Sequence, residues 1–308
     1  MFHGEGSKQN TVLTIVSPYL FITPAYLVFI VFLLGPAVFA IVMSLFNWTG
    51  LRSPVWHGLT NYIQILTDDV FWQVVRNTLF YSAVSIFVVI PLALLLALAL
   101  NSPDLLFRNV WRAVYFAPIV TSTVAVSQSF LMLLNRDFGL LNVALARLGL
   151  STYDWLGSRS LAIIPVAVII VWRWTGLTSI YFLAGLQGIP SELYDAGEVD
   201  GANLFQSFWH ITLPQIKPIT LFVTVIVLIG SLQVFDEPQI LTQGGPSNAT
   251  RSVVQYLYSR GIEQFRFSYA ATVGFVLFCT IALFSVLQFR FFQEQRKKAP
   301  LNGDAHGR

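Results

Sequence analysis

The sequence contains little charge. Only 11% of its 308 residues are Asp, Glu, Lys or Arg, whereas 55% are hydrophobic. Soluble globular domains carry roughly 25% charged residues, so this composition excludes an ordinary soluble domain. We therefore expect an integral membrane protein whose main environment is the lipid bilayer.

The chain also lacks the residues that several kinds of chemistry require. Cys279 is the single cysteine, which excludes an intrachain disulfide framework and a Cys-based metal site. The four histidines lie too far apart in the sequence for a local metal set, and no Gly-x-x-x-x-Gly-Lys-Ser/Thr phosphate loop occurs. We expect no catalytic residue, no metal site and no cofactor bound by this chain.

The positive charge is concentrated at the C-terminal end. The net charge is +3, and Arg290, Arg296, Lys297 and Lys298 follow the last apolar stretch. A basic cluster beside a membrane segment indicates orientation in the bilayer, and we expect no nucleic-acid partner.

Long apolar stretches separated by charged residues predict an all-α membrane bundle. A helix needs about 20 mainly apolar residues to cross the hydrocarbon core. Six segments are candidates: 20–43, 79–100, 113–134, 161–185, 219–235 and 270–289. We divide the chain into an N-terminal cytoplasmic or interfacial segment (1–19), a six-span domain (20–292) and a cytoplasmic tail (293–308). Six spans place both termini on one side, and the basic tail favours the cytoplasmic side.

The stretch 189–218 between the fourth and fifth segments differs from its surroundings. It carries four acidic residues, so it cannot lie in hydrocarbon and must be a solvated loop. These residues are Glu192, Asp195, Glu198 and Asp200. The pair Asp200-Gly201 predicts a turn between two short helices. The second helix, from Ala202 or Asn203 to Pro214, carries a wide apolar face that is formed by Leu204, Phe205, Phe208, Trp209 and Ile211.

The spacing of residues in this loop resembles the EAA loop of permease subunits of binding-protein-dependent ABC importers. The matching residues are Asp195-Ala196-Gly197, Asp200-Gly201-Ala202, Ile211, Leu213 and Pro214. The chain departs from the usual pattern at Asp195 and Gly197, where glutamate and alanine are common. The resemblance implies a type I importer permease in which the loop docks on a cytoplasmic ATPase subunit. The alternative is an ordinary interfacial loop whose aromatic residues rest on lipid headgroups.

The residues that the resemblance assigns to ATPase coupling are Asp195, Ala196, Gly197, Asp200, Gly201, Ala202, Phe205, Phe208, Trp209, Ile211, Leu213 and Pro214. Gly201 is expected to be the most sensitive of them, because a side chain there would strain the turn and re-aim the second helix. Gly197→Ala is expected to be mild.

Two further stretches resemble the carbohydrate-uptake branch of this family. They are 235–246, which contains Gly-Gly-Pro, and 267–271. The large extra outer domain of the maltose-type subunit is missing. The resemblance implies carbohydrate import across the bacterial cytoplasmic (inner) membrane by a multi-pass subunit. Its expected partners are a second related permease, two ATPase subunits that bind ATP and Mg²⁺, and an extracytoplasmic solute-binding protein. The competing hypothesis is an ion- or proton-coupled secondary transporter, which would show inverted repeats and acidic residues within spans.

Arg173 is the polar residue best placed for a substrate path. It lies in the fourth predicted span between Trp172 and Trp174. A charge at the bilayer centre costs at least ~2.5–3.5 kcal/mol, so such a residue faces a cavity or a partner. Arg173 could instead extend outward or pair with Asp236 or Glu237. The further candidates for the path are Trp172, Trp174, Gln128, Gln233 and Asp236.

Overall fold

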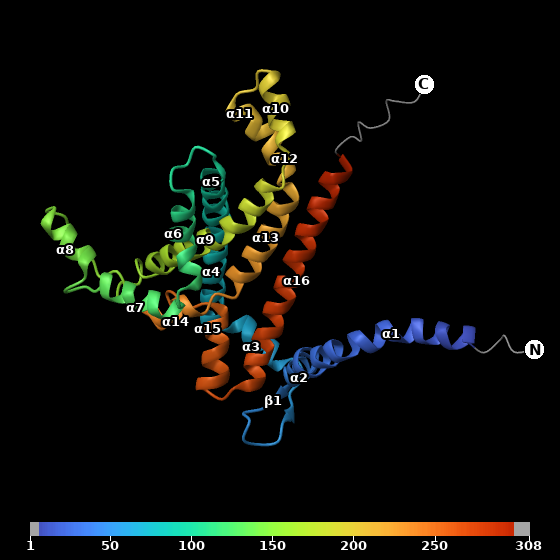
Figure 1. Ribbon diagram of the computed structural model, residues 1–308. Helices are drawn as coiled ribbons and strands as arrows, with labels where there is room; N and C mark the ends of the chain where they lie inside the picture. Colours follow the sequence, from blue (N-terminus) through green and yellow to red (C-terminus); the bar gives the residue numbers. More distant parts are fainter. Residues whose placement is uncertain (1–5, 299–308) are drawn as a thin grey trace, which may run out of the picture. The chain divides into compact units, whose positions relative to one another are not determined.

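The computed structural model describes residues 6–298, with side chains from 17 to 290. The ends of the predicted N-terminal segment and tail (1–5 and 299–308) lie outside these residues. Almost all described elements are helices, as predicted (Figure 1). The chain divides into two compact units, one formed by residues up to 64 with 260–275 and the other by 65–259 with the residues from 276 onward.

The first unit begins with one long apolar helical stretch. It comprises α1 (Gly6–Phe29), a π-helical turn η1 (Ile30–Leu34) and α2 (Gly35–Met43). The part Ser17–Met43 has the length and composition of a membrane span. Its large apolar side chains are exposed on all sides, from Tyr19 to Val42. A helix that is apolar all round without a protein partner is suited to lipid or to another membrane protein.

A small polar cluster follows this stretch in the same unit. The strands β1 (Phe46–Asn47) and β2 (Val55–Trp56) form an antiparallel hairpin, and α3 (Thr60–Thr67) comes next. Asn61 Nδ2 donates to the carbonyl oxygens of Ser44 (2.9 Å) and Phe46 (2.8 Å). Thr272 Oγ1 also donates to Ser44 O (3.2 Å). Side chains from α3 and from α16 (Phe267–Lys298) therefore hold the backbone that leaves the first span.

The second unit contains three long candidate spans. The first, Asp69–Asn101, combines α4 (Asp69–Val84), η2 (Ser85–Val89) and α5 (Ile90–Asn101). The second is α9 (Ile163–Gln187). The third, Lys217–Leu241, joins α13 (Lys217–Leu232) to α14 (Asp236–Leu241). The predicted segments 79–100 and 219–235 are thus parts of longer helical stretches. The longer stretch Lys217–Leu241 includes two acidic residues, Asp236 and Glu237.

The core of the second unit depends on small side chains in α5. Ala93 and Ala97 are buried against Phe182 and Leu186 of α9 and against Ile216, which precedes α13. In lipid there is no hydrophobic driving force between helices, so their association depends on close packing. Small residues allow membrane helices to approach closely enough for it.

The third predicted span is bent rather than straight. α6 (Arg108–Val120) and α7 (Thr123–Leu133) meet at 97°, so the prediction of one helix over 113–134 is wrong. Thr121 is extended, and its hydroxyl bonds back to Ala117 O (2.8 Å), which ends α6. Within the described residues, five helices could cross a membrane, or six if this pair counts as one span. A short helix, α8 (Leu140–Arg147), follows.

Hydrogen bonds join the connection after α14 to α4. Asn77 Nδ2 donates to the carbonyl oxygens of Asn248 (2.8 Å) and Arg251 (3.0 Å), and Tyr81 Oη donates to Thr250 O (2.7 Å). The buried Thr78 hydroxyl accepts from the backbone N–H of Val253 (2.9 Å). These bonds satisfy backbone groups that would otherwise be buried without partners. The chain continues through α15 (Val253–Tyr258) and η4 (Ser259–Glu263) to α16 (Phe267–Lys298).

Candidate functional site

The loop between α9 and α13 contains the two short helical parts that the sequence predicts. The first is α10 (Ser191–Val199). The second comprises α11 (Leu204–Ser207), η3 (Phe208–Thr212) and α12 (Leu213–Gln215). Figure 1 shows all of them gathered beyond the start of α13.

Pro214 does not end the second helical part, contrary to the sequence prediction. The helix runs through it to Gln215. The π-helical turn before Pro214 directs the N–H of Leu213 to Phe208 O, five residues back. Proline has no N–H to donate, and its position directly after this wider turn tolerates the missing donor.

The turn between the two parts depends on Gly201, whose φ is +78°. Gly201 N donates to Glu198 O (3.0 Å), and Ala202 N donates to Gly197 O (2.9 Å). These bonds cap the last carbonyls of α10 in the arrangement that needs a left-handed residue after the helix. The prediction of a glycine turn at this position is confirmed.

A reciprocal pair of hydrogen bonds starts the second part. Asn203 Oδ1 accepts from Gln206 N (2.9 Å), and Gln206 Oε1 accepts from Asn203 N (2.8 Å). This capping box satisfies two backbone donors at the helix start. The spacing Asn-x-x-Gln is visible in the sequence, and it would have placed the helix start one or two residues later than predicted.

Two contacts hold the two parts together. Tyr194 Oη and Thr212 Oγ1 are 2.9 Å apart and share a hydrogen bond. At Gly197, a β-carbon would lie 2.9 Å from Ile211 Cδ1, so the absence of a side chain lets α10 approach the second part. Sequence reasoning missed Tyr194 and Thr212, because neither residue belongs to the apolar or the acidic pattern.

The structure divides the predicted coupling residues into two groups. Phe205 and Trp209 are 70% and 50% exposed, and the neighbouring Leu204 is 92% exposed. Asp195, Ala196, Asp200, Gly201 and Pro214 are also exposed, whereas Gly197, Ala202, Phe208, Ile211 and Leu213 are half-buried. A hollow of about 470 Å³ lies between the two parts, and Gly201 and Ala202 line it. The loop thus presents an apolar outer face and a hollow, both without a covering element in the described chain.

Arg173 forms a largely buried ion pair. Its Nη1 lies 3.2 Å from Oε1 of Glu237, and the two side chains are only 19% and 6% exposed. The partner is therefore Glu237, which the sequence analysis named only as an alternative, while Asp236 is exposed. Trp174 packs against Gly230 of α13.

Three other residues predicted for a substrate path are exposed. Trp172 is exposed and packs near Phe130, with 6.1 Å between ring centroids. Gln128 and Gln233 are exposed as well. The assignment of these residues to a substrate path stays a prediction.

Comparison with known proteins identifies the family. Residues 89–297 match the family described as the binding-protein-dependent transport system inner membrane component. The arabinooligosaccharides transport system permease protein AraP of Bacillus subtilis is 37% identical, over 89% of this chain and 88% of that protein. The lactose transport system permease protein LacF of Rhizobium radiobacter is 36% identical, over 91% of this chain and 95% of that protein.

A solved structure shares the fold. It is a chain of a bacterial alginate ABC transporter in complex with a periplasmic protein that holds an alginate pentasaccharide. The TM-score is 0.79 at 23% identity, and the match covers 92% of this chain and 96% of that chain. This protein belongs to the family of binding-protein-dependent transport system inner membrane components.

Proposed function

We propose that this chain is the membrane-spanning subunit of an ATP-driven importer for a carbohydrate, whether a sugar, an oligosaccharide or a polyol-like solute. The observation that carries the proposal is the loop 189–218. It combines acidic residues with an exposed apolar face, so neither hydrocarbon nor water suits all of it. A groove on a partner protein accommodates both the apolar face and the acidic residues. The proposed partner is an ATPase subunit. The permeases of relatives named for arabinooligosaccharides and lactose support a carbohydrate as the solute.

The proposed assembly contains one copy of this chain, a second related permease, two ATPase subunits and an extracytoplasmic binding protein. ATP and Mg²⁺ bind to the ATPase subunits in this scheme. The alginate transporter, which was solved together with its periplasmic protein, supports the role of a binding protein. The exposed apolar stretch Ser17–Met43 also fits a membrane partner.

The proposed orientation follows from the loop. An ATPase subunit works in the cytoplasm, so the loop and both termini are cytoplasmic if the bent pair counts as one of six spans. The basic cluster after the last apolar stretch, which begins at Arg290, agrees with this side, because positive charge favours the cytoplasmic face. The proposed six-span domain covers 20–292, between the segment 1–19 and the tail 293–308.

One observation favours a second candidate, a proton-coupled secondary transporter. Glu237 is an acidic residue buried in the helical stretch Lys217–Leu241, and buried carboxylates carry protons in such transporters. The ion pair with Arg173 gives the carboxylate a structural partner, however, so the ATP-driven importer is the better-supported function.

Uptake measurements distinguish the two candidates. Proteoliposomes that contain the purified complex receive the binding protein and a panel of labelled oligosaccharides outside, and either ATP inside or a proton gradient. We expect uptake with ATP that persists when the gradient is collapsed. Uptake driven by the proton gradient without ATP would overturn the proposal.

A further inference from the structure

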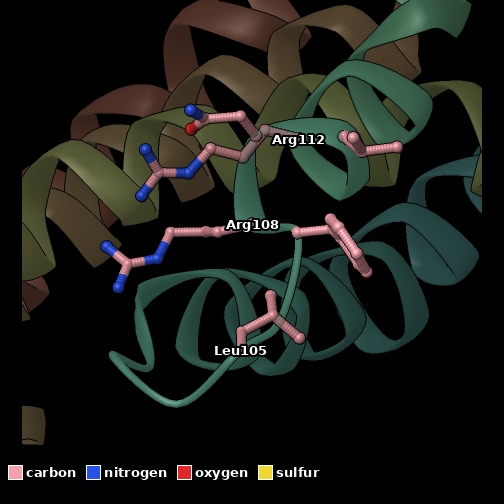
Figure 2. Close-up of a pocket in the computed structure, with 6 residues that line it drawn as sticks. Leu105, Arg108 and Arg112 are labelled. Carbon is pink, nitrogen blue, oxygen red and sulfur yellow. The ribbon is translucent and has the colours of Figure 1, made fainter.

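The connection between α5 and α6 borders a second, open hollow of about 500 Å³ that the proposed transport function does not use. Its lining comes from the loop before α6 and from the first turns of α6. The residues are Leu105, Phe107, Arg108, Asn109, Val110 and Arg112. Figure 2 shows Arg108 and Arg112 extending their guanidinium groups to the same side, above Leu105.

The two arginines are uncompensated. They lie one helical turn apart on α6, and neither forms an ion pair with a carboxylate in the described part of the chain. Arg112 Nη2 donates to Leu100 O at the end of α5 (3.2 Å), while its buried Nε has no acceptor. Asp104, the acidic residue of the loop, is exposed and pairs with neither. Two fixed positive charges at a hollow favour an anion.

The start of α6 adds to this preference. Phe107 precedes the helix in a left-handed conformation (φ 56°), offers no side-chain cap, and no acidic residue occupies the first turn. The first N–H groups of a helix and its dipole attract negative charge. The arginines and the uncapped helix start therefore act on the same hollow.

Apolar side chains surround the hollow. Phe107 and Val110, which line it, are 70% and 58% exposed, and the neighbouring Leu106 is 73% exposed. The exposed rings of Trp111 and Tyr115 lie next to each other further along α6, with 6.3 Å between ring centroids. Tryptophan and tyrosine mark the headgroup level of a bilayer, so this surface has a polar site for a headgroup and an apolar border for acyl chains. A soluble anion would gain nothing from that border.

The end of α5 lies on the same side of the unit as the coupling loop. Ala97 of α5 shares a buried cluster with Leu186, at the end of α9, and with Ile216, at the end of the loop. In the orientation proposed above, this is the cytoplasmic leaflet, which supplies anionic lipids. We propose that Arg108, Arg112 and the start of α6 form a binding site for the phosphate headgroup of an anionic phospholipid.

Lipid titration tests this site on the intact complex. The complex, purified in detergent, is titrated with phosphatidylglycerol, with phosphatidylcholine of the same acyl chains, or with inorganic phosphate, and bound lipid is counted by native mass spectrometry. Each arginine near a membrane surface contributes about fivefold in affinity, which corresponds to about 1 kcal/mol. We expect phosphatidylglycerol affinity to fall about fivefold in Arg108→Gln and about 25-fold in the double variant Arg108→Gln/Arg112→Gln.

The matched control is Arg147→Gln/Arg159→Gln, which removes the same charge elsewhere and should leave the affinity unchanged. The hydrogen bond to α5 comes from Arg112, so Arg108→Gln leaves it intact. If the double variant does not assemble, this single variant still tests whether the arginines bind the headgroup. Equal binding of phosphatidylglycerol by all variants, or equal binding of phosphatidylcholine, would overturn the proposal. Displacement of the lipid by millimolar phosphate would identify a site for free phosphate and overturn the lipid assignment. Because lipid counts do not depend on uptake, a failure here is separable from a failure of the importer function.

Discussion

Gly201→Val is expected to abolish substrate-stimulated ATP hydrolysis and uptake while leaving the amount of complex in the membrane near the parental level. The backbone at this position has φ +78°, and a non-glycine residue in that conformation costs roughly 1–2 kcal/mol. A β-branched residue tolerates it least. Relief of this strain changes the direction of the second helical part. Phe205 and Trp209 then no longer fit into the groove of the proposed partner. The membrane helices are formed by other residues and stay folded.

Two control variants separate backbone strain from the loss of space. Apart from Gly201 and its two chain neighbours, no residue has a heavy atom within 4 Å of where a β-carbon at this position would lie, so a side chain itself has room there. Gly201→Asn should therefore keep most activity, because asparagine adopts the left-handed conformation more readily. Gly197→Ala should be mild, because the atom that it approaches is the flexible end of Ile211. Parental transport by a fully assembled Gly201→Val complex would contradict the role assigned to this turn.

Removal of either partner of the Arg173–Glu237 pair is expected to destabilise the protein by about 3–5 kcal/mol. The cost arises because one charge remains buried without a partner. Replacement of both partners by apolar residues of similar volume is often neutral or stabilising. We therefore expect Arg173→Met and Glu237→Leu each to lower the unfolding temperature in detergent, and the double variant to recover it.

Uptake by the double variant tests whether Arg173 also contacts the substrate. We expect the double variant to recover uptake together with stability, because Glu237 already engages the guanidinium group. A double variant that is stable but takes up no solute would place Arg173 in the substrate path. A double variant that is less stable than both single variants would show that the Arg173–Glu237 ion pair does not link α9 to α14 in the way that its distance of 3.2 Å indicates.

The coupling loop was predictable from the sequence because its signals are local. Charged residues within a long apolar region identified a solvated segment, and Asp200-Gly201 identified the turn whose positive φ the structure shows. The capping box of Asn203 and Gln206 was equally readable, since its two members are three residues apart. Apolar length alone likewise located the candidate spans, apart from their ends.

The features that the sequence did not reveal depend on distant or conformational information. Mean hydropathy does not reveal the 97° bend after Val120, because the three polar residues at the bend, Thr121, Ser122 and Thr123, lie between two largely apolar stretches. Whether Glu237 or Asp236 pairs with Arg173 depends on which face of α14 is turned toward α9. The two paired residues are 64 positions apart, so no local pattern reveals it. The bond between Tyr194 and Thr212 joins two polar residues that lie outside any periodic pattern.

Site-specific photo-cross-linking tests most directly whether the coupling loop (189–218) docks on an ATPase subunit. A photoreactive amino acid replaces Phe205, which is 70% exposed, and the control is Phe138 in the α7–α8 connection, which is 67% exposed. Membranes are irradiated with the whole complex in place, and the adducts are identified by mass spectrometry. Our account predicts an adduct between position 205 and an ATPase subunit, and none between position 138 and that subunit. Adducts of position 205 with lipid alone would contradict it and would show that the loop is an ordinary interfacial segment.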